Sequence, residues 1–397
     1  MHTSRWIQSA VLFMLAGTLA CTIVACGGDA SGPDSSLGEW GEPATLTEDL
    51  RIGALESDED AYMLGRITEL VPDGEGGVYA FDDRVPAIRH FNAEGTYIKT
   101  IGAKGSGPGE YEDIILGMDH LPDGRLIVRD PRNRRFTMYT PDGEFSEQWG
   151  LDSGLYTSRA MYVDRQGQVY ARIVTSRPQQ DQPFETGLLR LDGNGLPVDT
   201  LHAPSMPGDE LPPSGFFSVG VDWDLHPDGY VVVGRSDAYA IELRKPEGTV
   251  VLSRDLERVE LNSEERAEWE AVREWQIETQ GQFMSQLPPP TPSVKPFYRT
   301  IYSGKDGSIW VRRYVEAVKH DRAGEPAPPE GAPPPRTWRE PVVYDVFQDD
   351  GTFLGEVHVP EGVSLWTYNL DEIWATTSGE MGETYLVRMS LSIPDRS

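Results

Sequence analysis

Six short segments that align without a gap constrain the fold of this chain more than any other feature. Each has a glycine, or in one case an aspartate, two residues ahead of three successive apolar residues. The apolar triplets are Val78–Ala80, Leu126–Val128, Val169–Ala171, Val231–Val233, Ile309–Val311 and Ile373–Ala375. A strand with one wet face would alternate apolar and polar residues, so these strands are expected to be covered on both faces. Sheets stacked radially, each between two neighbours, require this pattern.

Tight polar turns flank these strands. One series precedes them, as in Pro122–Gly124, Pro227–Gly229 and Lys305–Gly307, and a second series, such as Pro141–Gly143, joins the outer strands. The pattern predicts an all-β fold, a six-bladed β-propeller of four-stranded antiparallel blades. The predicted blades are residues 66–103, 114–150, 158–201, 217–260, 299–359 and 363–395. Residues 45–57 are expected to supply the outer strand of the last blade and close the ring, so the propeller would span residues 45–397.

Two of the repeats resemble a known family. Val78–Phe91 and Leu126–Tyr139, with the glycine-rich linker Gly102–Tyr111 between them, are similar to NHL repeats and to the related six-bladed propeller lipoproteins. The resemblance covers residues 66–150. Later blades keep the core strand and the turns but lose the linker and the aspartate that follows the strand, so the resemblance there is architectural only.

The amino terminus reads as an export signal. Arg5 precedes an apolar stretch from Trp6 to Ala25, which is too short for a committed membrane span. Ile23–Gly27 resembles the lipobox of bacterial lipoproteins, which implies that Cys26 is lipidated and that residues 1–25 are removed. Residues 26–44 would form a flexible tether. The chain would then be anchored in the bacterial envelope, on the periplasmic or cell-surface side. The alternative is an ordinary secretory signal that is cleaved near Gly27 or Ala30.

Composition excludes several chemistries. The only cysteines are Cys21 and Cys26, so with Cys26 lipidated the mature domain has no thiol for a disulfide, a soft metal or a nucleophile. A formal net charge of −29 disfavours nucleic acid as a partner. The seven histidines form no local metal-binding pair, and no nucleophile elbow, phosphate loop or dinucleotide motif is present.

The two faces of the predicted propeller differ in loop length. The long segments Thr175–Thr186, Val315–Pro341, His202–Gly215 and Leu261–Pro296 all fall on the face where second strands end, which we call the loop-rich face. The opposite, short-turn face carries the Asp-Gly turns. One long segment, between blades 4 and 5, predicts a helix with Ser263 as its N-cap and Trp269 and Val272 on its apolar side. Long loops on a rigid scaffold favour binding, although neutral surface insertions are the alternative.

Arginines recur just after the core triplets. They are Arg129, Arg172, Arg235, Arg312 and Arg313. Gathered near the loop-rich mouth, they would suit an anionic small molecule, peptide or polymer. Alternatively, each pairs with an acid such as Asp82 or Asp130. The sequence therefore predicts an envelope-anchored binding or scaffold propeller that recognises an anionic ligand or an envelope protein.

An enzyme is the second hypothesis. Six-bladed propellers include divalent-metal lactonases and lyases, which is an analogy of fold alone. Carboxylates expected on the innermost strands, Glu69, Asp119 and Asp224, would be the ligands of a calcium ion on the central axis. The chain would then be a metal-dependent hydrolase or lyase. No catalytic residue is indicated by a local motif.

Overall fold

The computed structural model describes residues 37–151, 161–175, 186–208, 210–284, 286–322 and 328–393. The predicted signal peptide, the predicted lipidation site Cys26 and most of the predicted tether lie outside these residues. The described part is mostly β-strand, with one α-helix, α1 (Ser263–Gln280), and two 3-10 turns, Asp60–Tyr62 and Gly281–Phe283. None of its helices is long and apolar enough to cross a membrane.

Four separate sheets have four antiparallel strands each, in chain order from one edge to the other. The first has β2 (Ile67–Pro72), β3 (Val78–Asp82), β4 (Ala87–Phe91) and β5 (Tyr97–Ile101). The second has β8 (Met118–His120), β9 (Leu126–Asp130), β10 (Arg135–Tyr139) and β11 (Phe145–Gly150). The third has β12 (Met161–Val163), β13 (Val169–Val174), β14 (Thr186–Leu191) and β15 (Pro197–His202). The fourth has β16 (Val221–Leu225), β17 (Val231–Arg235), β18 (Ala240–Lys245) and β19 (Gly248–Ser253).

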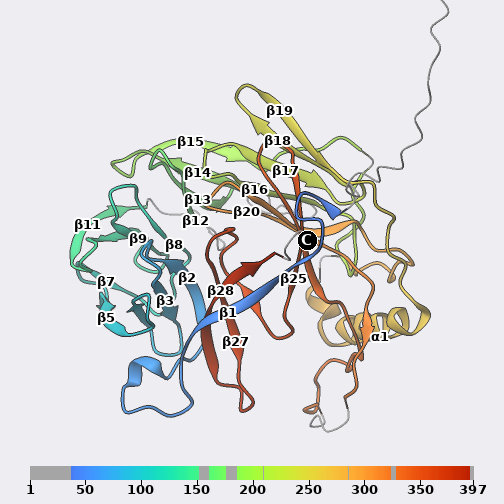
Figure 1. Cartoon of the computed structure of the whole chain (residues 1–397), viewed down its shortest axis with the longest axis horizontal. Helices are drawn as coiled ribbons and strands as arrows, with labels where there is room; N and C mark the ends of the chain where they lie inside the picture. Colours follow the sequence, from blue (N-terminus) through green and yellow to red (C-terminus); the bar gives the residue numbers. More distant parts are fainter. Residues whose placement is uncertain are drawn as a thin grey trace, which may run out of the picture. The chain divides into compact units, whose positions relative to one another are not determined.

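A fifth, eight-stranded sheet consists of two four-stranded runs. One run is β20 (Tyr298–Ser303), β21 (Ile309–Arg313), β24 (Val342–Phe347) and β25 (Phe353–Val359). The other is β26 (Ser364–Leu365), β27 (Ile373–Ser378), β28 (Thr384–Ser392) and β1 (Ala44–Ile52). Strand β1 pairs antiparallel with β28 and touches β25 through a short parallel pairing, so the first and last strands of the described chain lie side by side (Figure 1).

Two small sheets lie in connecting segments. Strands β6 (Ala103–Lys104) and β7 (Glu110–Tyr111) pair within the glycine-rich linker, and β22 (Val318–Lys319) pairs with β23 (Trp338–Arg339) between β21 and β24.

The core is divided among the gaps between neighbouring sheets. Strands β3 and β9 are buried along their whole length, as expected for strands covered on both faces. One apolar cluster joins Phe81 of the first sheet to Val128 of the second, and another joins Ile241 of the fourth sheet to Ile309 of β21. The innermost strands β2 and β8 contact each other, as do β8 and β12, and β16 and β20. This is the architecture of a β-propeller.

The turns ahead of the second strands depend on glycine. Gly124 and Gly307 have φ angles of 84° and 97°, a backbone region that other residues rarely adopt. The short polar turn can therefore reverse the chain directly into a buried strand.

Helix α1 begins differently from the sequence prediction. Its N-cap is Asn262, whose side chain accepts a hydrogen bond of 2.8 Å from the Glu265 N–H, while Ser263 is the first helical residue. The prediction of Ser263 as the cap is wrong because the amide of the preceding residue already satisfies that N–H. The apolar side of the helix is docked: Val272 is buried, and the Trp269 ring lies 4.5 Å from the ring of Phe216.

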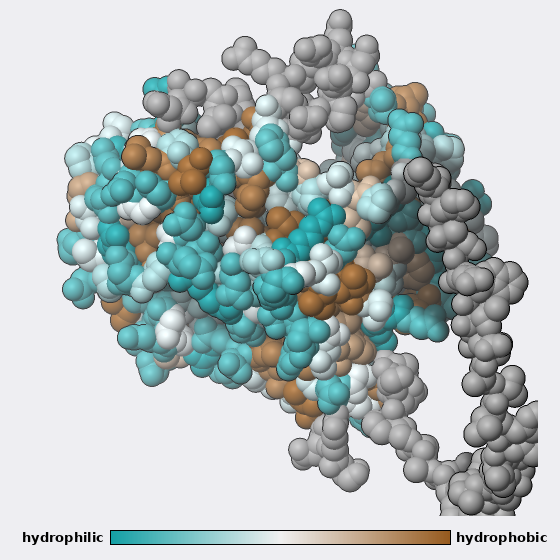
Figure 2. Space-filling view, turned by 90° about the horizontal axis from the view of Figure 1, so that it is seen from above, coloured by the Kyte–Doolittle hydropathy of each residue, from teal (hydrophilic) through white to brown (hydrophobic). Residues whose placement is uncertain are grey.

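The surface seen in Figure 2 is mostly hydrophilic, with apolar residues in separate groups rather than one continuous patch.

Candidate functional site

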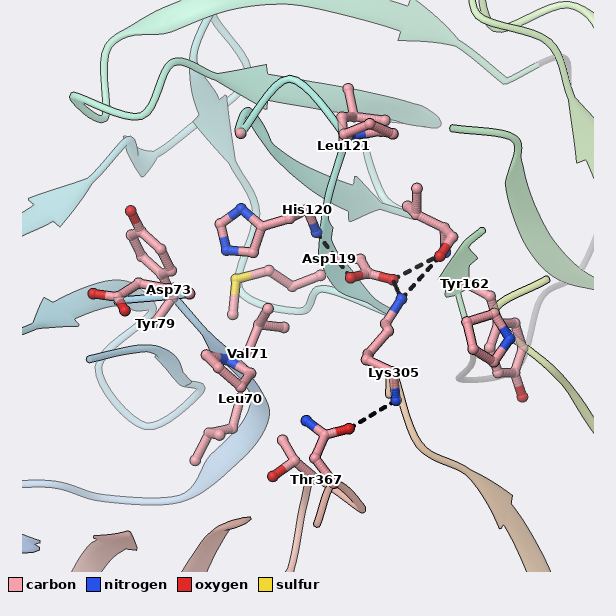
Figure 3. A pocket seen from close by; sticks show the side chains of 18 of the residues that line it. Leu70, Val71, Asp73, Tyr79, Asp119, His120, Leu121, Tyr162, Lys305 and Thr367 are labelled. Atoms are coloured by element: carbon pink, nitrogen blue, oxygen red, sulfur yellow. Dashed lines mark hydrogen bonds and ion pairs between the residues drawn. The ribbon is translucent and has the colours of Figure 1, made fainter. Parts of the chain in front are cut away.

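A cavity of about 1090 Å³ lies on the short-turn face and receives residues from all six four-stranded runs. We call it the central cavity. The contributors include Leu70, Asp119, Tyr162, Pro227, Lys305 and Tyr368, one from each run or the turn beside it. This cavity therefore lies opposite the loop-rich face on which the sequence predicted a ligand. Figure 3 shows its interior.

Lys305 reaches across this cavity. It leaves the turn between β20 and β21, and its Nζ lies 2.5 Å from Asp119 Oδ2 on β8 and 2.9 Å from the Val163 carbonyl oxygen on β12 (Figure 3). Asn369 fixes the base of the side chain by accepting the Lys305 N–H at 2.7 Å. The Lys305 side chain remains 55% exposed, whereas that of Asp119 is only 9% exposed. The ammonium thus links three runs and still faces the cavity.

Asp119 is fully engaged with protein groups. Its Oδ1 accepts the His120 N–H at 2.8 Å, and its Oδ2 accepts the Val163 N–H at 2.9 Å in addition to the lysine. Asp224, which aligns with Asp119 ahead of a Pro-Asp-Gly turn, accepts the Ser303 N–H at 2.7 Å in the same manner. Each carboxylate therefore joins the innermost strand of one run to that of the next.

The three predicted calcium ligands are not brought together. Within the described residues, the only group of His, Asp and Glu side chains close enough to share an ion is His226, Asp228 and Asp349. Glu69, Asp119 and Asp224 lie in three different strands, and Lys305 occupies the approach to Asp119.

The His226 group is close enough to hold a metal ion, and each of its side chains already has a partner within the protein. His226 Nδ1 accepts the Asp228 N–H at 3.1 Å, and its Nε2 lies 3.2 Å from the Gly307 carbonyl oxygen. Asp349 pairs with Lys245 Nζ at 2.9 Å. Calcium prefers oxygen ligands, and this imidazole has no free lone pair. In the structure these contacts hold neighbouring turns together.

One wall of the cavity has two aromatic rings stacked on each other, and one of them is hydrogen-bonded to an acid. The rings of Tyr79 and His90 are stacked at 4.2 Å, and His90 Nε2 lies 2.9 Å from Asp73 Oδ2. Burial opposes ionisation of Asp73, but the bonds from His90 and two backbone N–H groups outweigh it and lower the pKa of this carboxyl. The His120 ring lies 5.4 Å from Tyr79, and burial lowers the pKa of His120, so this imidazole is neutral near pH 7.

The cavity is acidic overall. Its lining contains six carboxylates and two basic side chains: Asp73, Glu75, Asp119, Asp142, Asp164 and Glu372 against Arg165 and Lys305. Burial raises the pKa of Glu372. Such a lining disfavours an anionic ligand.

Two of the five predicted arginines form ion pairs. Arg235 Nε lies 2.9 Å from Asp237 Oδ2. Arg313 lies 3.1 Å from Asp345 and 2.8 Å from Glu356. The acids that pair with these two arginines are not Asp82 or Asp130. Those two carboxylates accept hydrogen bonds from backbone N–H groups of nearby loops.

The other three arginines have different surroundings. Arg129 is 1% exposed beside the Phe136 ring, and burial lowers its pKa to about 10. Arg172 lies over the Trp223 ring at 5.5 Å. Arg312 is half-buried, with no ion pair among the described residues. The structure thus separates the five into buried, paired and accessible positions rather than one exposed group.

Sequence reasoning missed Lys305. Its turn aligns with Pro122–Gly124 and Pro227–Gly229, and lysine stands where those turns have proline. That departure within an aligned series was the available signal. Tyr79 and His90 gave no signal, because an apolar strand position and an outer-strand histidine are ordinary features of a blade.

We expect Asp222→Asn to remove part of the pH dependence of stability. Burial raises the pKa of Asp222 to about 6 from its ordinary value of 3.8, although the Ile301 N–H that it accepts opposes this. Between these values the folded chain holds a proton that the unfolded chain has lost, so stability falls as pH rises from about 4 to 6 and this contribution is constant above. The variant should be more stable at pH 7 by up to about 3 kcal/mol. Urea unfolding of the wild type and the variant at pH 4, 5, 6 and 7 measures the difference in their free energies of unfolding. A difference that does not change with pH would contradict the prediction.

No protein-family model and no curated protein sequence matches the chain. Among solved structures it is similar to a member of the duf4221 family from Bacteroides vulgatus, at 11% identity and a TM-score of 0.51, over 89% of this chain and 99% of that one. It is also similar to virginiamycin B lyase from Staphylococcus aureus, at 12% identity and a TM-score of 0.38, over 88% and 99%. A third is the calcium-binding protein regucalcin from Agrobacterium tumefaciens, at 9% identity and a TM-score of 0.38, over 87% and 95%. These neighbours are propeller-type proteins, and identities this low concern the fold alone.

Proposed function

We propose that this chain is a six-bladed propeller lipoprotein of the bacterial envelope that binds a small organic ligand in its central cavity. The six four-stranded runs, with β1 completing the last, support the blade count, and α1 would be inserted between the fourth and fifth blades. The apolar stretch ahead of Cys26 supports export and anchoring.

The ligand that suits this cavity is a small organic amine. The observation that carries this proposal is the excess of carboxylates in a cavity that every run lines. Glu75 is exposed at the rim, and Glu372 lies half-buried beside it in the same lining. An excess of carboxylates favours a cationic ligand. A volume of about 1090 Å³ is in the range of small-molecule sites.

The residues do not support the metal-dependent hydrolase or lyase in the same way. Both oxygens of Asp119 accept hydrogen bonds from backbone N–H groups, and Lys305 neutralises its charge. Binding therefore remains the better proposal.

Charge changes of opposite sign test the proposal. With glucosamine as the probe and glucose as its neutral match, we expect Lys305→Met to tighten glucosamine binding and Glu75→Gln combined with Glu372→Gln to weaken it, each about threefold to tenfold. Isothermal titration of the mature chain gives the affinities. Lys319→Met is the matched control, because Lys319 is similarly exposed and pairs with Glu264 away from the cavity. Equal binding of glucose and glucosamine, or equal shifts in the control, would refute an amine site.

A further inference from the structure

A second cavity lies on the loop-rich face, with a volume of about 640 Å³. It is formed where the link into β2 and the loop after β3 meet the end of β27 and the link into β26. The polar residues that matter for its chemistry are Arg66, Arg84, Ser364, Thr376, Thr377 and Ser378. None of the five arginines predicted from the sequence lines it.

The charge of this cavity is opposite to that of the central cavity. Its lining contains two arginines and no aspartate or glutamate. The chain as a whole has 64 acidic and 35 basic residues, whereas this lining has no acid. Asp83 neutralises Arg66, so the local positive charge comes from Arg84, which has no ion pair among the described residues. A field of this sign attracts anions to one point of an acidic protein.

Arg84 provides the accessible charge. Its side chain is exposed, and the described residues give it no ion pair or side-chain hydrogen bond. Arg66 uses Nε and Nη2 to bind Asp83, which leaves Nη1 for a further acceptor. A guanidinium with unused donors suits a phosphate or carboxylate group.

Asp82 fixes the backbone at both arginines. This carboxylate is fully buried and accepts the N–H groups of Gly65, Arg66 and Arg84 at 2.7, 3.1 and 3.0 Å. It also pairs with the buried Arg89 at 3.0 Å. Its bonds are therefore directed to the protein, and it fixes the backbone from which the two arginines extend.

Hydroxyl groups line the opposite side. Thr376 Oγ1 accepts the Trp366 Nε1–H at 3.1 Å, so its own proton is available to donate. The hydroxyls of Thr377, Ser378 and Ser364 have no hydrogen bond within the described part of the chain. In the gap-free alignment Thr376 occupies the position at which three other repeats have arginine. A blade without that arginine thus offers small donors beside the arginines of its neighbour.

We propose that this cavity is a binding site for the anionic group of a hydroxylated small molecule, a sugar phosphate or a sugar acid. Arg84 and Arg66 bind the anionic group, and the hydroxyls of Ser364, Thr377 and Ser378 bind the sugar oxygens. A volume of about 640 Å³ exceeds that of a bare oxyanion and accommodates a sugar-sized body. The site is separate from the central cavity and does not depend on its ligand.

Titration calorimetry with the mature chain tests this site. The probes are glucose 6-phosphate, glucuronate and neutral glucose. We expect saturable binding of at least one anion and none of glucose at this site, with Arg84→Ala weakening the anion at least tenfold. Thr377→Val should weaken it less. A preference for glucose 6-phosphate over glucuronate identifies phosphate as the recognised group, and the reverse preference identifies carboxylate.

Arg132→Ala is the matched control. Arg132 stands two residues after Asp130 as Arg84 stands two after Asp82, and its N–H binds that aspartate at 3.1 Å in the same way. Its guanidinium pairs with Asp113 instead of facing a cavity. Anion binding should survive Arg132→Ala and also Lys305→Met, which alters only the central cavity. Absence of anion binding, or equal loss in Arg84→Ala and Arg132→Ala, would overturn the proposal.

Discussion

Replacing Lys295 with methionine is expected to lower the free energy of unfolding by about 3–5 kcal/mol. Lys295 is completely buried, and its Nζ lies 2.8 Å from both Glu265 and Glu340 and 3.0 Å from the Val315 carbonyl oxygen. Methionine matches the volume of the lysine stem but leaves Glu265, which is 2% exposed, as an unpaired buried charge. Urea unfolding gives the loss, and hydrogen exchange should locate it in the α1 segment.

Two variants separate charge from packing at Lys295. Lys319→Met removes an exposed lysine that pairs with Glu264 in the first turn of the same helix, and it should change stability little. Adding Glu265→Gln to Lys295→Met should recover part of the lost stability, because the unpaired buried charge is then removed. No recovery, or an equal loss in Lys319→Met, would show that the ion pairs do not anchor this segment.

The strand pattern was sufficient to predict the fold class. The β-propeller of four-stranded antiparallel sheets is confirmed. The prediction succeeded because successive apolar residues, as in Val78–Ala80 and Ile309–Val311, indicate a strand that is buried on both faces. Each triplet packs against the neighbouring sheets in the same way, so a pattern within one short segment predicts how the sheets are arranged around the ring. The cap of α1 was missed by one residue because Asn262 and Ser263 are both good N-caps, and only backbone geometry distinguishes them.

The sites depend on contacts that no local pattern contains. Lys305 and Asp119 are far apart in sequence, and they meet only because the turn after β20 points toward β8. The surroundings of each arginine depend likewise on the neighbouring strands: Arg313 pairs with Asp345 of β24, whereas Arg129 is buried beside Phe136. The prediction of a ligand on the loop-rich face stays a prediction.

Asp345→Ala is expected to destabilise the protein by about 3–5 kcal/mol. Asp345 is completely buried in β24, where it pairs with Arg254 at 2.7 Å and Arg313 at 3.1 Å and accepts the Tyr239 hydroxyl. Alanine removes this carboxylate from two largely buried guanidinium groups, both of which also contact Glu356. Denaturant unfolding of the wild type and the variant measures the loss.

Asp345→Asn distinguishes the lost charge from the lost volume. Asparagine keeps the shape and an acceptor for Tyr239, so a loss close to that of alanine would show that the negative charge is what the two arginines require. A loss below about 1 kcal/mol in both variants would mean that Glu356 neutralises them without Asp345.

The same network determines which arginine can test ligand binding. Reversing the charge at Arg313 would place a third carboxylate beside Asp345 and Glu356, so any lost binding would follow from unfolding. Reversal at Arg129 has the same defect, since that side chain is 1% exposed. Arg312 belongs to the same strand, but it is half-buried and no acid among the described residues pairs with it. Arg312→Glu should therefore retain the wild-type unfolding midpoint. A change in that variant's affinity for the anionic ligand predicted from the sequence would then be an effect on binding and not on folding.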